Sequence, residues 1–463
     1  MKRILVVYIG MAVLITISTV ALYLAVRPLN IEAIELHYLP ENRLRVRINT
    51  VTNKTASVRV KYWKEGSKDT LWSDKYDNQS DYRVILYNLL PQQRYLYQVI
   101  AQRGDEVDQS KVYPLETKSI YHTTPYFTLD TLVDSIRSEM QSRYFLTQIL
   151  TEPGAAVILN GWGEMVWYES FSKAVKVSSW TADRTVLCII GPENVPSSGG
   201  DEIVEVNLKG EYVRHLTVGQ GDMDKLVHHE VRKDADGNIY TITFDYKICD
   251  LTPVGGGAAD TVKADGIVVF DPNGKKIWEW SVLDHMDLLT YPAVLKDKDD
   301  LVHANALFDD GNGCFLMSFR DLNQVWKIEK KTGNVVWKFG QEGDFSMRDD
   351  DLFFAQHYAH INRKGELMIL DNGIKKKQSR ALSFQLDEFN RRYRRLLEIP
   401  YPTAFFSSVK GNSALVGESW VLSCLTDPRV FVLSDYNGNL LWKVSVGGDP
   451  YRIEEVPSLN QTP

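Results

Sequence analysis

Six similar strand–turn–strand units follow one another along most of this chain, and they constrain its fold more than any other feature. Each unit has a short run of strand residues, a turn that usually contains glycine, and a second strand that often ends in tryptophan. The units cover residues 157–167, 203–213, 267–278, 325–337, 382–394 and 430–442. Repetition of one hairpin plan predicts a fold built from repeated sheets.

The spacing of these hairpins favours a β-propeller. Their mean spacing is about 55 residues, slightly above the roughly 40 to 50 of common propeller blades, so inserted loops are expected. A long antiparallel sandwich is the alternative, but radial repetition explains six similar hairpins better because it protects the sheet edges. We therefore expect an all-β protein in which residues 120–463 form a six-bladed β-propeller with the catalytic site.

The N-terminal segment is long and apolar enough to span a membrane. Residues Ile4 to Val26 carry no charge and lie between Lys2-Arg3 and Arg27. A bilayer core of about 30 Å needs roughly 20 such residues in a helix, whereas the apolar core of a cleaved signal peptide is about 7 to 15 residues long. We expect an uncleaved single-pass transmembrane helix within residues 1–30, in the cell inner membrane. Because more basic residues precede the helix than follow it, the bulk of the chain should lie on the periplasmic side.

Residues 31–119 are expected to form a separate, small β-sandwich domain. Short alternating runs such as Leu44–Ile48 are separated by polar turns. Leu90-Pro91 followed by Tyr95 resembles the stretch in fibronectin type III domains where a tyrosine anchors a corner between strands. A short helix over residues 130–148 is expected to lead into the propeller.

The composition argues against several partners and cofactors. The chain has 53 basic and 60 acidic residues and no basic tract that would neutralise a run of phosphates, so no nucleic-acid partner is expected. The cysteines, at positions 188, 249, 314 and 424, show no metal-ligand spacing and indicate neither a zinc site nor a disulfide framework, although one disulfide stays open. The chain has no Walker-type glycine loop, which makes a nucleotide triphosphate a poor candidate substrate. The sequence does not determine the oligomeric state.

Three histidines take similar places in the repeats. His229, His303 and His357 each stand eight residues before a turn glycine, and an apolar strand follows each turn. Equivalent positions in successive blades are related by rotation about the axis, so the three imidazoles are predicted to meet at one end of the central channel. Arg320 ends the strand that follows the His303 turn, and its guanidinium would suit an anion. His228 falls out of this register, and its position alone indicates a surface or core role.

This set of side chains suits chemistry on an oxyanion. Three imidazoles and a guanidinium, without a matching cluster of carboxylates, can bind negative oxygens and perform nucleophilic or acid–base work near neutral pH. A sulfuryl or phosphoryl group fits, because its oxygens need donors and its central atom is open to in-line attack by a neutral imidazole. The residues alone do not choose which imidazole attacks.

Four short motifs, in this order among the repeats, resemble those of the bacterial arylsulfate sulfotransferases: His228-His229-Glu230, His303-Ala304-Asn305, Ser318-Phe319-Arg320 and Gln356-His357. The resemblance spans about Ile120 to the C-terminus. It implies transfer of a sulfuryl group from a phenolic sulfate ester to a phenol through a sulfohistidine, with no nucleotide, cofactor or metal. It implies His357 as the nucleophile, with His303, His229 and Arg320 binding sulfuryl oxygens or moving the phenolic proton. Asn305 and His228 are implied as substrate-binding residues.

Other classes of function stay open. Axial histidines could bind Fe²⁺ or another divalent ion, as in a metal-dependent propeller oxygenase or lyase. Repeated glycine and tryptophan also suit a quinone-dependent dehydrogenase, which we rank lower. The propeller could instead be a non-enzymatic, membrane-tethered scaffold, since a fold does not prove a function. The mutual geometry of the three histidines and Arg320 separates these classes: they could surround one small anion, surround one metal ion, or be dispersed.

Overall fold

The computed structural model describes residues 27–120, 126–195, 198–291 and 293–459. The chain divides into two compact units, one that ends at Lys118 and one that spans Ser119–Leu459. The predicted transmembrane segment, Ile4 to Val26, lies outside the described residues. Within the described ranges, no helix has both the length and the apolar character needed to cross a membrane.

The smaller unit is built from seven antiparallel strands. They are β1 (Ile31–Leu39), β2 (Asn42–Lys64), β3 (Leu71–Trp72), β4 (Tyr76–Leu86), β5 (Arg94–Arg103), β6 (Glu106–Gln109) and β7 (Tyr113–Glu116). The long strand β2 pairs with β1 and β4 along its first half and with β5 along its second, and its alternate residues, such as Val46, Ile48 and Val60, are fully buried. The hydroxyl of Tyr95 accepts a hydrogen bond from the backbone N–H of Leu90 at 2.9 Å. The resemblance of this unit to fibronectin type III domains stays a prediction.

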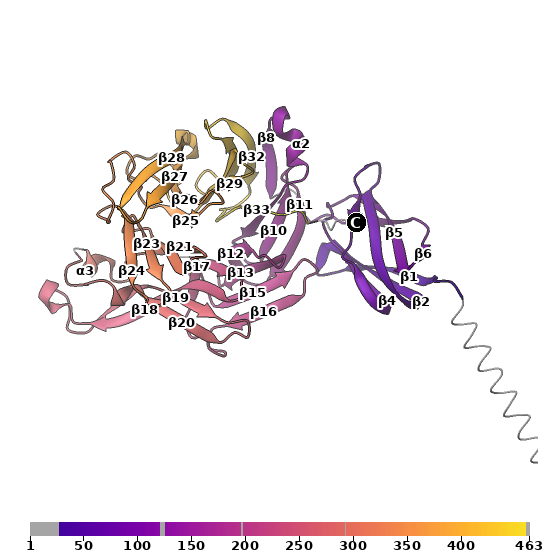
Figure 1. Cartoon of the computed structure of the whole chain (residues 1–463), viewed down its shortest axis with the longest axis horizontal. Helices are drawn as coiled ribbons and strands as arrows, with labels where there is room; N and C mark the ends of the chain where they lie inside the picture. The colour runs from indigo at the N-terminus through magenta and orange to yellow at the C-terminus, as the bar shows by residue number, and fades with distance from the viewer. Residues whose placement is uncertain (1–26, 121–125, 196–197, 292, 460–463) are drawn as a thin grey trace, which may run out of the picture. The chain divides into compact units, whose positions relative to one another are not determined.

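The larger unit is a six-bladed β-propeller, which confirms the fold predicted for the repeats (Figure 1). Blade 1 contains β33 (Glu454–Val456), β9 (Tyr144–Ile149), β10 (Gly154–Asn160) and β11 (Met165–Phe171). Blade 2 contains β12 (Ala174–Trp180), β13 (Thr185–Gly191), β15 (Glu202–Asn207) and β16 (Tyr212–Thr217). Blade 3 contains β14 (Gly199–Gly200), β17 (Val227–Lys233), β18 (Ile239–Cys249), β19 (Asp260–Phe270) and β20 (Lys276–Ser281).

The remaining three blades follow the same antiparallel plan. Blade 4 contains β21 (Ala304–Asp309), β22 (Cys314–Phe319), β23 (Gln324–Glu329) and β24 (Val335–Gly340). Blade 5 contains β25 (His357–Ile361), β26 (Leu367–Asp371), β27 (Arg380–Asp387) and β28 (Arg392–Pro400). Blade 6 contains β29 (Asn412–Val416), β30 (Trp420–Leu425), β31 (Val430–Asp435), β32 (Leu440–Val446) and β8 (Phe127–Leu132). The hairpins recognised in the sequence are the outer strand pairs of blades 1 to 5 and the pair β31–β32 of blade 6, which β8 covers on its outer side.

Strands from both ends of the larger unit close the ring. The early strand β8 pairs with β32 as the outer strand of blade 6, and the C-terminal strand β33 pairs with β9 as the inner strand of blade 1. The predicted helix over residues 130–148 is therefore wrong. That stretch contributes to β8 and β9, with only η1 (Asp134–Ile136) and α2 (Arg137–Met140) between them, because pairing with distant strands overrides a weak local preference for helix.

Short helical segments occupy some of the connections. They are η2 (Thr252–Val254), η3 (Val282–Asp284), α3 (Val294–Asp297) and η4 (Thr403–Phe405). With η1 and α2 they are the helices of the described residues, and none exceeds four residues. The larger unit is thus held together by its sheets.

Tryptophans at the ends of the outer hairpins tie neighbouring blades together. The indole N–H of Trp167 donates to the carbonyl of Leu208 in blade 2, that of Trp280 to Gly333 in blade 4, and that of Trp442 to a turn carbonyl in blade 1. An indole is largely apolar and carries one polar donor, so it can fill the space between two sheets and bond to the next turn. Trp167 and Trp442 end two of the repeated hairpins, and this bond to the next blade gives a physical reason for tryptophan at those two positions.

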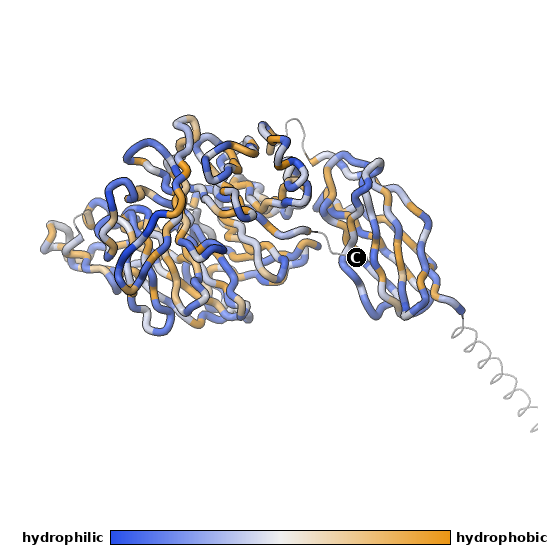
Figure 2. Tube along the Cα trace, turned by 45° about the horizontal axis from the view of Figure 1, so that its top comes forward, coloured by the Kyte–Doolittle hydropathy of each residue, from blue (hydrophilic) through white to orange (hydrophobic). Residues whose placement is uncertain are grey.

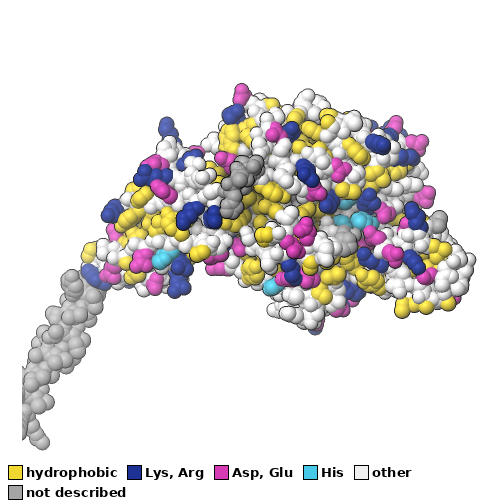
Figure 3. All heavy atoms as spheres, turned by 180° about the vertical axis from the view of Figure 1, so that it is seen from behind, with side chains coloured by type: hydrophobic (Ala, Val, Ile, Leu, Met, Phe, Trp, Pro, Cys, Tyr) yellow, Lys and Arg dark blue, Asp and Glu magenta, His cyan; other side chains and the backbone are white. Residues whose placement is uncertain are grey.

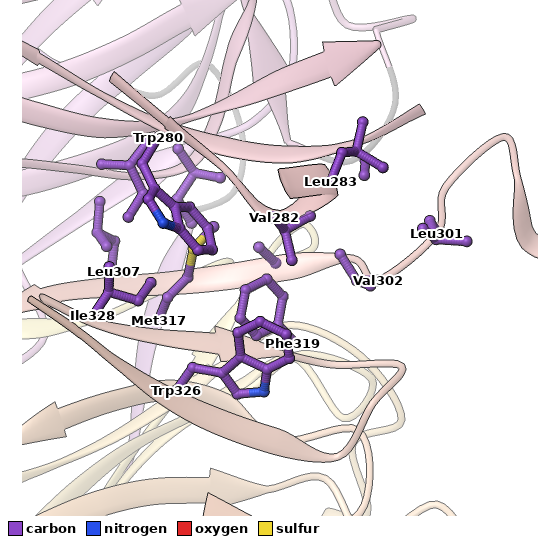
Figure 4. Packing of buried hydrophobic residues seen from close by; sticks show 14 of the residues in the cluster. Trp280, Val282, Leu283, Leu301, Val302, Leu307, Met317, Phe319, Trp326 and Ile328 are labelled. Atoms are coloured by element: carbon purple, nitrogen blue, oxygen red, sulfur yellow. The ribbon is translucent and has the colours of Figure 1, made fainter. Parts of the chain in front are cut away.

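Apolar side chains of adjacent blades form the core. Figure 2 shows hydrophobic residues along the strands and hydrophilic residues in many connections. Between blades 3 and 4, side chains from η3 and β20 face those from β21 to β23, and Trp280, Met317, Phe319 and Trp326 meet there (Figure 4). Burial of each such large apolar side chain stabilises the folded state by about 1.5–3 kcal/mol. This packing holds the inner strands in fixed positions around the axis.

Candidate functional site

Residues from all six blades, or from the loops that follow their strands, line one cavity of about 730 Å³, which therefore lies on the propeller axis. The three predicted histidines, His229, His303 and His357, line it together with Arg320. Lys176 of blade 2 also lines the cavity. Figure 3 shows histidine side chains that reach the surface of the molecule with Lys or Arg side chains beside them. The structure thus brings together the four residues that the sequence selected.

His357 is buried at the start of β25 and has a defined tautomer. Its Nδ1 lies 2.8 Å from the side-chain oxygen of Asn372. The amide nitrogen of Asn372 donates to the carbonyls of Ser407 and Lys410, which can only accept, so the oxygen must face the imidazole. Nδ1 of His357 therefore carries the proton, and Nε2 carries the lone pair.

Burial also keeps this imidazole neutral. It lowers the pKa of His357 to about 3, with nearby His303 and Arg320 acting in the same direction against the hydrogen bond to Asn372. The resulting group is a neutral imidazole with a free ring nitrogen near neutral pH. Such a nitrogen can attack an electrophilic centre.

His303 is arranged in the opposite way. Its Nδ1 lies 2.6 Å from a carboxylate oxygen of Asp300, three residues earlier in the chain. Burial of the ring disfavours the charged form, but the hydrogen bond and the charge of Asp300 outweigh burial and raise the pKa of His303 above its usual value. His303 is therefore the imidazole best suited to hold and release a proton on Nε2.

His229 lies in a bulge of β17 with a positive φ of 57°. This backbone conformation is uncommon for histidine, and bulges of this kind re-aim side chains beside active sites. Its ring centroid is 5.0 Å from that of His303, and its Nδ1 is 2.7 Å from Nδ1 of His228. Burial and these two imidazoles hold the pKa of His229 well below its usual value. The hydroxyl of Tyr451 and a guanidinium N–H of Arg452 both donate to its carbonyl and fix the bulge.

Arg320 supplies the permanent positive charge of the site. Its backbone N–H donates to the carbonyl of His303 at 3.0 Å, and its side chain donates to Asp321 at 2.6 Å. Its side chain is 23% exposed, and its charge helps to lower the pKa of His357. The guanidinium is therefore held by a neighbouring carboxylate at the cavity wall, with donors left for a bound anion.

The structure does not place His228 and Asn305 in the cavity lining. His228 is 1% exposed, stacks on Phe244 with ring centroids 4.0 Å apart, and lies 3.1 Å from Asp265. The side-chain amide of Asn305 donates to the carbonyl of Gln356, the residue before His357. Both side chains thus hold the residues that line the cavity.

The three axial histidines do not occupy one ladder position. His357 is paired opposite Leu370 in β26, His229 lies within a bulge, and His303 precedes the paired part of β21. The shared spacing of eight residues between each histidine and its turn glycine does not give the same pairing position, because the bulges between them differ from blade to blade. The imidazoles meet because each comes from the same end of an inner strand.

Sequence analysis missed three polar residues that contact imidazoles at or beside the cavity. Asp300, Asn372 and Asp265 contact His303, His357 and His228, respectively. Asp300 could have been found from its place three residues before a candidate histidine. Asn372 and Asp265 gave no such signal, because only strand pairing and blade packing bring them to their partners.

The fold and this cavity define a class of protein, a six-bladed β-propeller with an axial cavity lined by histidines and an arginine. The sequence model of the family described as arylsulfotransferase (ASST) matches residues 194–447, more than half of the chain. The chain belongs to this family. The matched segment includes His229, His303, Arg320 and His357. No curated protein matches the sequence.

Solved structures are similar to parts of this chain at low sequence identity. A protein of unknown function from Bacteroides caccae is 10% identical, and the match covers 68% of this chain and 99% of that one, with a TM-score of 0.44. Virginiamycin B lyase from Staphylococcus aureus is 12% identical, and the match covers 72% of this chain and 90% of that one, with a TM-score of 0.36.

Proposed function

We propose that this protein transfers a sulfuryl group from a phenolic sulfate ester to a phenol through a covalent intermediate on His357, without a nucleotide. One observation carries the proposal: a buried, neutral His357 shares a cavity with Arg320 and with His303, whose pKa is raised. A nucleophile without charge, a fixed cation and a proton donor are the three groups that attack on an anionic ester requires.

The first half-reaction forms the covalent intermediate. Nε2 of His357 attacks the sulfur of the donor ester, and an N–S bond forms as the bond between sulfur and the phenolic oxygen breaks. The departing oxygen takes the Nε2 proton of His303, which becomes neutral. Arg320 donates hydrogen bonds to the sulfuryl oxygens and offsets their negative charge.

The second half-reaction returns the enzyme to its starting state. An acceptor phenol takes the place of the departed one, and its hydroxyl proton passes to Nε2 of His303. Its oxygen attacks the sulfur, the N–S bond breaks, and His357 regains its lone pair. Before this step, as the acceptor binds, His229, whose low pKa keeps it neutral, accepts a hydrogen bond from the phenolic hydroxyl and orients its oxygen toward the sulfur. The hydroxyl proton then turns from His229 to His303 as the oxygen attacks.

The position of Arg320 supports an anionic substrate over a divalent cation. Arg320 lines the same cavity as the three histidines, and its charge would repel a metal ion bound between them. A scaffold function would not require one cavity to contain both a neutral, buried His357 and a His303 whose pKa is raised.

The experiment that tests the reaction uses residues 27–463 with 4-nitrophenyl sulfate and phenol, without nucleotide or added metal. Nitrophenolate release that depends on phenol is expected in the wild type, and none is expected in His357→Ala. A mass increase of one sulfuryl group on a His357 peptide, after donor alone, identifies the intermediate. Absence of turnover with several phenols in folded protein would refute the proposed reaction.

We also propose that Ile4 to Val26 anchors the chain in the inner membrane, with the propeller on the periplasmic side, because the segment is uncharged and long enough to span the bilayer. The full chain should stay in the membrane fraction in high salt and be released by detergent. Protease added to spheroplasts should degrade the propeller. Protection of the propeller in intact spheroplasts would contradict the orientation.

A further inference from the structure

A buried carboxylate is linked to His229 through a second imidazole. Asp265 lies in β19 and is 1% exposed. Its Oδ2 accepts the backbone N–H of Ala304 at 2.7 Å, and its Oδ1 lies 3.1 Å from Nε2 of His228. The contact between Oδ1 and Nε2 is close but is not aligned as a hydrogen bond. The carboxylate nevertheless stabilises a proton on that nitrogen.

His228 is held rigidly between this carboxylate and His229. Its ring stacks on Phe244 at an interplanar angle of 15°. Its Nδ1 lies 2.7 Å from Nδ1 of His229. Two imidazole nitrogens at this distance share one proton, since two lone pairs or two N–H groups would repel each other. The tautomers of the two rings are therefore coupled.

Only two neutral arrangements satisfy this contact. In the first, Nδ1 of His229 donates to Nδ1 of His228, whose proton is then on Nε2 and faces Asp265. In the second, His228 donates to His229, and Nε2 of His228 turns a lone pair toward the carboxylate. The charge of Asp265 disfavours the second arrangement. The first leaves Nε2 of His229 as a hydrogen-bond acceptor.

We propose that Asp265 is a positioning residue, which acts through His228 to keep Nε2 of His229 as an acceptor for the hydroxyl of the acceptor phenol. This inference rests on the proposed sulfuryl transfer. The other charged and titratable groups around His229 are His303, His357, Arg452 and Tyr451, and none of them is an anion that could replace Asp265.

The proposal separates the two halves of the reaction. The donor 4-nitrophenyl sulfate has no hydroxyl that could donate to His229, so the first release of 4-nitrophenolate does not depend on the tautomer of His229. An acceptor phenol must be oriented through its hydroxyl before its proton passes to His303, so the second half depends on a hydrogen-bond acceptor at Nε2 of His229. A wrong tautomer should slow sulfuryl transfer to phenol and leave the first release unchanged.

Asp265→Asn is the informative variant. The N–H of Ala304 would hold the amide oxygen in place of Oδ2, which turns the amide NH₂ toward Nε2 of His228 and favours the second arrangement. Proton-coupled ¹⁵N spectra of histidine-labelled residues 27–463, with His229 assigned by loss of its signals in His229→Gln, report the tautomer directly. The expected result is a proton on Nδ1 of His229 in the wild type and on Nε2 in Asp265→Asn.

Kinetics provide the second measurement. In Asp265→Asn, the burst of nitrophenolate should persist. Steady-state transfer to phenol should fall by about 10- to 100-fold, the loss seen when a residue that orients a metal-bound histidine is removed. The matched control is Asp234→Asn, in the turn that follows β17. An asparagine is compatible with this turn, because Asn362 accepts the equivalent backbone N–H in blade 5. This control should keep both rates.

The outcomes distinguish this inference from the proposed function. A proton on Nε2 of His229 in the wild-type spectrum would overturn the inference even if no variant folds. An unchanged tautomer in folded Asp265→Asn would also overturn it. A wild type that does not transfer sulfuryl groups would refute the proposed function, while the spectra would still report whether Asp265 sets the tautomer.

Discussion

The side-chain oxygen of Asn372 lies 2.8 Å from Nδ1 of His357, and two backbone carbonyls hold the amide nitrogen of the same asparagine. Asn372 therefore fixes both the tautomer and the ring orientation of the proposed nucleophile. We expect Asn372→Ala to lower sulfuryl transfer by about 10- to 100-fold, because the buried N–H of His357 would keep only its longer, 3.3 Å contact with the carbonyl of Ala355, and a poorly satisfied buried N–H costs about 1–3 kcal/mol. Steady-state kinetics measure this loss, and Asn437→Ala, in an exposed turn, is the control. An unchanged rate in folded Asn372→Ala would contradict the assignment.

The pH dependence should report His303 rather than His357. The pKa of His303 is raised by Asp300, and its protonated form supplies the proton, so activity should fall as the pH rises through that pKa. His357, with a pKa of about 3, stays neutral near pH 7 and therefore adds no change to the curve of activity against pH in that range. Asp300→Asn should move the alkaline limb to lower pH.

The leaving group provides a check on this acid. A donor with a poor leaving group needs the proton of His303, whereas 4-nitrophenyl sulfate does not. The alkaline limb should therefore be clear in kcat/KM for phenyl sulfate and weak for 4-nitrophenyl sulfate. Equal limbs for both donors would contradict the role of His303 as the acid.

Arg320 should contribute through its geometry as well as its charge. Lysine keeps the charge but lacks the planar pair of donors that matches two oxygens of one anion. We expect Arg320→Met to lower kcat/KM for the donor by about 100- to 1000-fold, the range for removal of an oxyanion donor, and Arg320→Lys to lower it less. Equal activity of Arg320→Lys and the wild type would show that charge alone suffices.

Arg452 ties the C-terminal closure to the site. It is 2% exposed, forms a two-point ion pair with Glu230 at 2.6 and 2.8 Å, and donates to the carbonyl of His229. Arg452→Met removes the two-point partner of the buried Glu230, which keeps a single contact with Arg232 at 3.1 Å, and should lower the free energy of unfolding by up to about 3–5 kcal/mol. Urea denaturation measures this change.

A matched surface pair controls that experiment. Arg429 and Asp449 form an ion pair in which both side chains are more than half exposed. Arg429→Met should change the free energy of unfolding by at most about 1 kcal/mol, because water screens an exposed pair. If both variants lose the same stability, Arg452 does not hold the closure in the way proposed.

The propeller could be predicted from local sequence patterns, namely the repeated strand–turn–strand units. The six hairpins each form paired strands of one blade, and Trp167 and Trp442, at the ends of two of them, bond to the neighbouring blade. The stretch 130–148 could not be predicted in this way. Its strands β8 and β9 pair with β32 and β33, about 300 residues later, and β9 also pairs with its neighbour β10.

The sequence by itself determined the repeat, the order of the blades and the four side chains, His229, His303, Arg320 and His357, that meet in the cavity. These depend on spacing within one blade and on rotation from blade to blade. Only the tertiary structure decided which imidazole is neutral and which holds a proton. That difference comes from Asn372 and Asp300, because the tautomer and the pKa of a buried ring depend on the one or two atoms that packing places against its nitrogens.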